Sequence, residues 1–135
     1  MPRILIVDDE PLVGLLIQSF LEELKYEALG PAETVSTALH LIETSEIDGA
    51  VLDLSLGPDQ SYGLAERLRE RAVPFAFATG RGEHEIGGGF EGTPVLAKPF
   101  TYAQFCALLD RLLPDVAMSK SSSSAGVHDV DASLI

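Results

Sequence analysis

Five polar residues in this sequence each stand at the end of a short apolar run. They are three acids, a hydroxyl and an amine. In an open parallel α/β sheet, ligands bind beyond the carboxyl ends of the strands. If the apolar runs are strands of such a sheet, the five side chains meet at one edge. They are Asp8, Asp9, Asp53, Thr79 and Lys98.

The chemistry that these residue types could perform is phosphoryl transfer. Three carboxylates that meet repel one another unless a cation joins them. Oxygen ligands suit Mg²⁺, which uses one or two carboxylates together with waters and phosphate oxygens. A lysine and a hydroxyl could bind the other oxygens of a phosphoryl group, and an aspartate can accept that group as an aspartyl phosphate. The residues therefore predict magnesium-dependent phosphoryl transfer onto a carboxylate.

The elements that would position these residues alternate between strand and helix along the chain. Short apolar runs predict buried strands, and apolar residues at helical spacing predict amphipathic helices. The predicted strands are Ile4–Val7, Glu27–Gly30, Gly49–Leu52, Pro74–Ala78 and Pro94–Ala97, and the predicted helices are Leu12–Leu24, Thr34–Thr44, Tyr62–Arg71 and a last one that Thr101 caps and Pro114 ends. This alternation predicts an α/β fold, a doubly wound parallel sheet with helices on both faces.

Two of these helical regions carry more specific predictions. In the first helix, the apolar stripe is Val13, Leu16, Ile17, Phe20, Leu21 and Leu24, and we expect it to face the sheet. Between the fourth and fifth strands, six of the fifteen residues from Thr79 to Thr93 are glycine. Each interior glycine costs a helix about 1 kcal/mol relative to alanine, so the helix expected there is predicted to be short, disordered or absent.

Composition limits the classes of function. The 135 residues suit one domain, and 46% of them are hydrophobic, enough for a core. With 21 acidic and 9 basic side chains, the formal charge of −12 disfavours nucleic acid and anionic membranes as partners and favours a cation or a basic protein surface. The single Cys106 excludes an internal disulfide framework. With neither a membrane span nor a signal peptide in view, we expect a cytoplasmic protein.

The composition changes near residue 115. Residues 115–135 contain six serines, four of them consecutive at Ser121–Ser124. We predict a folded domain over residues 1–114 and a flexible serine-rich tail over residues 115–135.

Four fragments in this order and spacing resemble the receiver domain of two-component response regulators. They are Ile4–Glu10, Val51–Asp53, Thr79-Gly80 and Lys98–Phe100. The resemblance implies a flavodoxin-like sheet of five strands in the order 2-1-3-4-5. It also implies that Asp53 is the phosphoacceptor and that Mg²⁺ is held by Asp8, Asp9, Asp53 and the backbone carbonyl of Ser55. Thr79 and Lys98 would bind the phosphoryl oxygens, and the Lys98-Pro99 peptide would be cis.

A narrower resemblance is to the "FAT GUY" group of single-domain response regulators. It rests on Pro74–Gly80 and Pro94–Phe100, and members of this group tend to have a mobile segment in place of the fourth helix. The chain departs from the group at Arg81-Gly82, where its motif has a tyrosine. It departs from ordinary receivers at Val95, where an aromatic switch residue normally stands.

The resemblance implies a signalling protein and not a conventional enzyme. We expect a single-domain response regulator that accepts a phosphoryl group on Asp53 from one or more histidine kinases. It would act on a downstream protein partner, as a monomer or weak dimer. Phosphate sink, shuttle and competitor for a shared kinase all fit equally well.

Other interpretations of the same residues stay open. The chain could be a receiver-like docking module that binds a kinase or partner whatever its phosphorylation state, which the unusual Val95 and Arg81 favour. A phosphatase with an aspartyl intermediate is disfavoured, because Ser55 stands where a second acid would be needed. Taken alone, Asp8 and Asp9 could be acids that cap a helix, and Lys98 could be a surface lysine.

Overall fold

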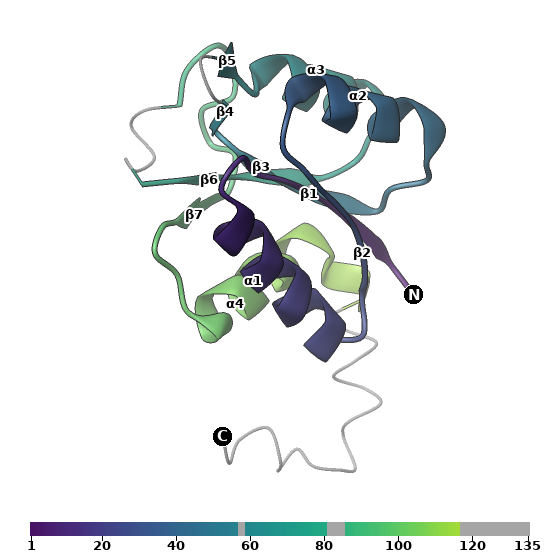
Figure 1. Cartoon of the computed structure of the whole chain (residues 1–135), viewed down its shortest axis with the longest axis vertical. Coiled ribbons are helices and arrows are strands. Elements are labelled where there is room, and N and C mark those ends of the chain that lie inside the picture. Colours follow the sequence, from purple (N-terminus) through teal and green to yellow (C-terminus); the bar gives the residue numbers. More distant parts are fainter. Residues whose placement is uncertain (57–58, 81–85, 117–135) are drawn as a thin grey trace.

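A sheet of five parallel strands forms the centre of the molecule (Figure 1). The computed structural model describes residues 1–56, 59–80 and 86–116. The sheet has the order β2-β1-β3-β6-β7. Its strands are β1 (Arg3–Val7), β2 (Glu27–Ala32), β3 (Gly49–Asp53), β6 (Phe75–Thr79) and β7 (Val95–Ala97). Counted along the chain without the small hairpin described below, this is the order 2-1-3-4-5, so the predicted α/β fold class is confirmed.

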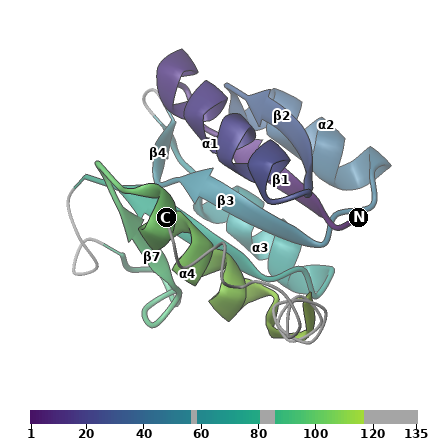
Figure 2. The same ribbon diagram turned by 90° about the horizontal axis from the view of Figure 1, so that it is seen from below.

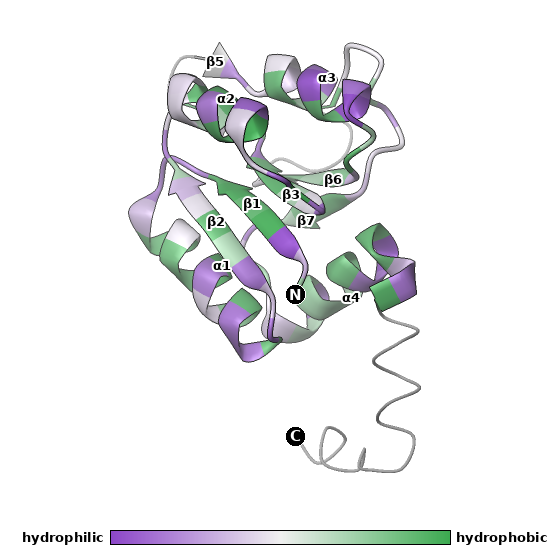
Figure 3. Ribbon diagram, turned by 90° about the vertical axis from the view of Figure 1, so that its right-hand side faces the viewer, coloured by the Kyte–Doolittle hydropathy of each residue, from purple (hydrophilic) through white to green (hydrophobic). Residues whose placement is uncertain are grey.

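Helices cover both faces of the sheet. Helices α2 and α3 lie on one face and α1 and α4 on the other, as Figures 1 and 2 show. Their bounds are α1 (Pro11–Glu23), α2 (Val35–Thr44), α3 (Tyr62–Glu70) and α4 (Tyr102–Leu112). The central strands are hydrophobic along most of their length (Figure 3), because each face of the sheet is buried under helices. None of the helices among the described residues is long and apolar enough to cross a membrane.

Helix α1 packs against the sheet with the apolar stripe that its sequence predicts, except at Leu16. Gly14, Ile17 and Leu21 are its buried residues. Leu16 was expected to face the sheet, but it is 42% exposed, and Leu12 and Leu15 are more exposed still. A β-carbon on Gly14 would lie 2.8 Å from Pro31 of β2, so this glycine lets the helix approach the sheet closely. Gly14 therefore belongs to the buried face of the helix, which the predicted stripe did not include.

Strand β2 runs further than the sequence suggested. The predicted end at Gly30 is wrong, because the strand continues through Pro31 to Ala32. Gly30 adopts φ +103, and a β-carbon there would lie 2.7 Å from the Ile6 carbonyl oxygen, so the position requires glycine. Pro31 is tolerated because β2 is an edge strand, where a missing N–H donor costs little.

A small antiparallel pair of strands follows β3, between two of the predicted elements. Strands β4 (Ser55–Leu56) and β5 (Asp59–Gln60) pair in the antiparallel sense. The hairpin leads directly into Ser61, which is fully buried and donates its backbone N–H to the Leu54 carbonyl at 3.0 Å. The start of α3 is therefore fixed to the residue that follows Asp53.

The connection between β6 and β7 contains no helix in its described part, residues 86–94. This agrees with the predicted short or absent fourth helix, although residues 81–85 lie outside the described residues. After β7, the Lys98-Pro99 peptide is cis, as the resemblance implied, and Gly30-Pro31 is cis as well. Thr101 caps α4 through a capping box with Gln104, which confirms the predicted start of this helix.

The end of the chain is only partly described. Helix α4 ends at Leu112, ahead of Pro114 as predicted, and Val116 packs against the hydrophobic cluster between α1, α4 and the sheet. The predicted tail, residues 115–135, otherwise lies outside the described residues, so its flexibility stays a prediction.

Candidate functional site

The carboxyl edge of the sheet collects the polar residues that the sequence singled out. Asp53 and Thr79 are the last residues of β3 and β6, Asp8 follows β1, and Lys98 follows β7. Asp8, Asp53 and Thr79 are three of the four buried polar or charged residues among those described. The parallel register brings them together, since Val7 pairs with Leu52, and Asp53 pairs with Ala78. The fold therefore brings these residues together at one edge, as the sequence predicted.

The Lys98 ammonium lies at the centre of the carboxylates. Its Nζ is 3.1 Å from Asp8 Oδ2, 3.5 Å from Asp53 Oδ2 and 2.9 Å from Glu10 Oε1. The Lys98 side chain is 15% exposed, whereas that of Glu10 is 61% exposed. One cation thus offsets the charge of two buried acids and one exposed acid.

Asp8 is the most deeply buried of these acids, at 1% exposed. Its Oδ1 accepts the backbone N–H of Glu10 at 2.9 Å. Its Oδ2 is buried and accepts no hydrogen bond from the described residues, but it forms an ion pair with the Lys98 ammonium at 3.1 Å. A buried carboxylate oxygen without a hydrogen bond is costly unless a cation lies beside it. Asp8 therefore presents a ligand atom suited to a metal ion.

Asp53 has a strongly altered acidity. The pKa of its carboxyl is raised to about 7, chiefly by burial and by the charge of Asp8, with a smaller contribution from a hydrogen bond with Asp9. Lys98 and the Ser55 N–H oppose this rise. Burial alone would lower the pKa of Lys98, but its close contacts with the Glu10 and Asp8 carboxylates and the nearby charge of Asp53 outweigh burial and raise that pKa. A cation bound at this site would lower the pKa of Asp53 and favour its ionised form.

The other predicted site residues lie at the same edge. Asp9 is half-buried and hydrogen-bonds with Asp53. The Ser55 backbone N–H donates to Asp53 Oδ1 at 3.4 Å. Thr79 is buried, and its carbonyl accepts the backbone N–H of Lys98 at 2.9 Å. The roles assigned to these residues, including metal binding by the Ser55 carbonyl, stay predictions.

Glu10 was missing from the predicted site. A carboxylate oxygen of Asp8, one of Glu10 and one of Asp53 lie within 4.8 Å of one another, a grouping that could hold a metal ion among the described residues. Its position as the third acid in the run Asp8–Glu10 was a signal in the sequence. Its contact with Lys98 was not, because the two residues are 88 positions apart.

The residues present fit a magnesium ion. The donor set is made of oxygens, which Mg²⁺ prefers, and it includes a buried oxygen without a hydrogen bond. Asp8, Asp9 and Asp53 stay the predicted ligands of such an ion. Such an ion would offset negative charge on a phosphoryl group.

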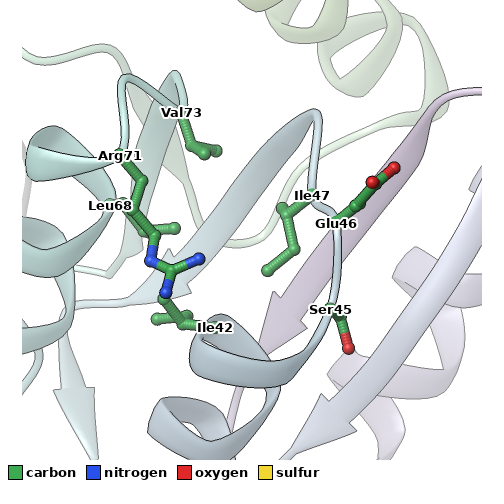
Figure 4. Close-up of a pocket in the computed structure, with 7 residues that line it drawn as sticks. All are labelled: Ile42, Ser45, Glu46, Ile47, Leu68, Arg71 and Val73. Atoms are coloured by element: carbon green, nitrogen blue, oxygen red, sulfur yellow. The ribbon is translucent and has the colours of Figure 1, made fainter.

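Two surface pockets differ in their relation to this edge. One, of about 280 Å³, lies beside the acids and is lined by Glu10, Val13, Leu16, Lys98, Pro99 and Phe100. The other, of about 220 Å³, lies between the carboxyl ends of α2 and α3 (Figure 4), and its lining residues are Ile42, Ser45, Glu46, Ile47, Leu68, Arg71 and Val73. Ile47 and Val73 precede β3 and β6, so this second pocket is at the amino edge of the sheet, opposite the acids.

Comparison with known proteins identifies the family. The model of the response regulator receiver domain matches residues 4–110. The chain belongs to the receiver domain family. Receiver domains are signalling modules of two-component systems and bind Mg²⁺ in their acidic site.

Curated relatives are longer proteins. The chain is 33% identical over 138 residues to the transcriptional activator protein IrlR of Burkholderia pseudomallei, covering 98% of this chain and 58% of that protein. It is 32% identical to the phyllosphere-induced regulator PhyR of Methylorubrum extorquens, covering 82% of this chain and 43% of PhyR. The chain thus spans about half the length of these relatives.

Solved structures include receivers of similar length. SdrG from Sphingomonas melonis Fr1 is 41% identical with a TM-score of 0.75, over 84% of this chain and 97% of SdrG. The receiver domain of the sensor histidine kinase PA1611 from Pseudomonas aeruginosa is 26% identical with a TM-score of 0.72, over 84% of this chain and 98% of that domain. It has a magnesium ion coordinated in its active site cleft.

Proposed function

We propose that this receiver domain accepts a phosphoryl group on Asp53 from a histidine kinase in a magnesium-dependent reaction, and that it signals through contacts with other proteins. The observation that carries the proposal is the cluster at the carboxyl edge, where Lys98 lies within 3.5 Å of both Asp8 and Asp53. A phosphoryl group on Asp53 would give Lys98 a new anionic partner without a rearrangement of the fold.

In the proposed reaction, a carboxylate oxygen of Asp53 attacks the phosphorus of a phosphohistidine. The P–O bond to Asp53 forms while the P–N bond breaks, and the electron pair of that bond stays on the histidine nitrogen. The raised pKa of Asp53 favours its neutral form when no cation is bound, whereas the attack needs the carboxylate. Bound Mg²⁺ would favour that carboxylate and bind phosphoryl oxygens, which accounts for the expected metal dependence.

Lys98 and Thr79 would bind the transferred group. The Lys98 ammonium already contacts the Asp53 oxygen that becomes part of the acyl phosphate or lies next to it. Thr79 ends the neighbouring strand, so a hydroxyl there could donate to a phosphoryl oxygen. Lys98 would exchange its contact with Glu10 for the stronger charge of the phosphoryl group.

An apolar surface next to the site supports a protein as the phosphoryl donor. Leu12 is 81% exposed and Leu15 57% exposed on the first turns of α1. Leu16, on the same helix, lines the pocket that also includes Lys98 and Phe100. Exposed apolar patches of this kind mark protein-binding surfaces, and a protein bound here would reach Asp53.

A titration with beryllofluoride, a phosphoryl mimic, tests the proposal. With Mg²⁺ present, backbone amide NMR signals near Asp53 and Thr79 of the native chain should shift to saturation. The Asp53→Asn variant, which offers no anionic oxygen to the mimic, should not respond. Equal shifts in both proteins, or none in the native chain, would refute the proposal.

A docking module that ignores phosphorylation is the second candidate, and the small side chain at Val95 favours it. Val95 is partly buried against the cluster beneath α2 and α3 and offers no aromatic ring. Under the first proposal, a partner captured by the native chain binds the beryllofluoride-loaded form and the Asp53→Asn variant with different affinities. Equal affinities would favour the second candidate.

A further inference from the structure

The described part of the β6–β7 connection is anchored to the body of the domain by one buried aromatic ring. Phe90 is 2% exposed, although it belongs to no helix or strand. Gly89, with φ +89, directly precedes it and provides a turn that other residues rarely adopt. The turn directs Phe90 into the hydrophobic cluster beneath α2 and α3, with Ile86 beside it at 6% exposed.

Tyr62, the first residue of α3, makes two contacts with this segment. Its ring stacks on Phe90 with centroids 5.5 Å apart and an interplanar angle of 10°. Its hydroxyl accepts the backbone N–H of Gly87 at 2.9 Å. Arg69, two turns along α3, adds a cation–π contact at 4.2 Å from the Phe90 ring and donates to the Gly89 carbonyl at 3.3 Å. Helix α3 thus holds residues 86–90 against the body of the domain.

Tyr62 is also connected to the phosphoacceptor along the backbone. The hairpin β4–β5 begins two residues after Asp53 and ends one residue before Ser61. The backbone N–H of the buried Ser61 donates a hydrogen bond to the Leu54 carbonyl. A change in the position of the chain after Asp53 therefore reaches the start of α3 through few intervening bonds.

A second connection runs through β6. The Phe77 ring lies edge-on to Tyr62 at 5.7 Å and edge-on to Phe90 at 6.0 Å. Phe77 is two residues before Thr79 on the same strand. A displacement of Thr79 toward a phosphoryl group would therefore also displace the rings of Tyr62 and Phe90, because close-packed rings have few alternative arrangements.

We propose that Tyr62 and Phe90 couple the phosphorylation state of Asp53 to residues 86–90. In the unphosphorylated chain, the Tyr62 hydroxyl and the stacked rings hold the segment against α3. Phosphorylation moves the end of β6 and the hairpin after β3, breaks the Tyr62–Gly87 hydrogen bond and frees the segment. The coupling takes the place of an aromatic switch at Val95, and it rests on the proposed phosphorylation of Asp53.

Amide hydrogen exchange measured by NMR tests this coupling. In the native chain, the Gly87 amide should exchange about tenfold faster once beryllofluoride and Mg²⁺ are bound, as the loss of one local hydrogen bond implies. In Tyr62→Phe, which keeps the ring but lacks the hydroxyl, the Gly87 amide should exchange fast in both states while the amides near Asp53 still respond. Tyr102→Phe, which removes the hydroxyl of a 40% exposed tyrosine on α4, is the matched control and should behave as native at Gly87.

The outcomes separate this coupling from the proposed function. A native response near Asp53 with unchanged Gly87 exchange would overturn the coupling alone. Native-like exchange in both states of Tyr62→Phe would also overturn it. No response near Asp53 in any of the proteins would overturn the proposed function, and the coupling with it.

Discussion

The carboxyl edge of the sheet and the segment 86–90 differ in the kind of interaction that holds each of them in place. At the edge, Asp8 and Asp53 are buried beside each other, and one ammonium group offsets both charges. In the segment, Phe90 is buried among aromatic rings. The buried charges lower the stability of the fold at the edge, whereas the packing of aromatic rings stabilises the segment. Mutations in the two regions should therefore change the free energy of unfolding with opposite signs.

The largest expected effect is the loss of the Phe90 ring. Phe90→Ala should lower the free energy of unfolding by about 3–5 kcal/mol, because it removes a buried ring and leaves a cavity. Tyr102→Ala, which truncates a 40% exposed ring, should cost only about 1 kcal/mol. Urea unfolding of both variants measures the difference. Equal losses would show that Phe90 does not anchor the segment.

Replacement of Asp53 should have a smaller effect of opposite sign, an increase in the free energy of unfolding. Its pKa in the folded protein, about 7, lies above the ordinary value of 3.8. The protonated carboxyl therefore stabilises the fold fully below pH 4, and this contribution is lost as the pH rises through about 7. In chelator, Asp53→Asn should exceed the native chain in stability by about 1–3 kcal/mol at pH 8 and match it near pH 4.

The same experiment has a simple control. Asp110→Asn removes an equivalent charge from the exposed face of α4, and its stability relative to the native chain should change little between pH 4 and 8. An Asp53→Asn variant that is no more stable than the native chain at pH 8 would contradict the view that charge repulsion strains the edge. Thermal unfolding across this pH range measures both variants.

The sheet and most of the site could be predicted from local patterns. Continuous apolar runs such as Ile4–Val7 indicate strands buried on both faces, and the rule that parallel strands end at one edge then brings Asp8, Asp53, Thr79 and Lys98 together. Neither step depends on the detailed packing of side chains. The capping of α4 by Thr101 is equally local, because its partner is three residues away.

The features that the sequence did not predict depend on contacts between distant residues. Glu10 and Lys98 meet across 88 positions, and Tyr62 meets Gly87 across 25. The close approach of Gly14 on α1 to Pro31 is another such contact, which helical periodicity cannot report. Strand β2 passes through Gly30-Pro31 because edge position overrides the usual preference of this pair for turns.

Transfer of radiolabelled phosphate from the purified histidine kinases of the same organism tests the central claim most directly. The account predicts that at least one phosphorylated kinase labels the native chain when Mg²⁺ is present. The label should map to Asp53, and it should be absent in Asp53→Asn and in chelator. Labelling of Asp53→Asn, labelling that persists without divalent cations, or no transfer from any kinase would contradict the account.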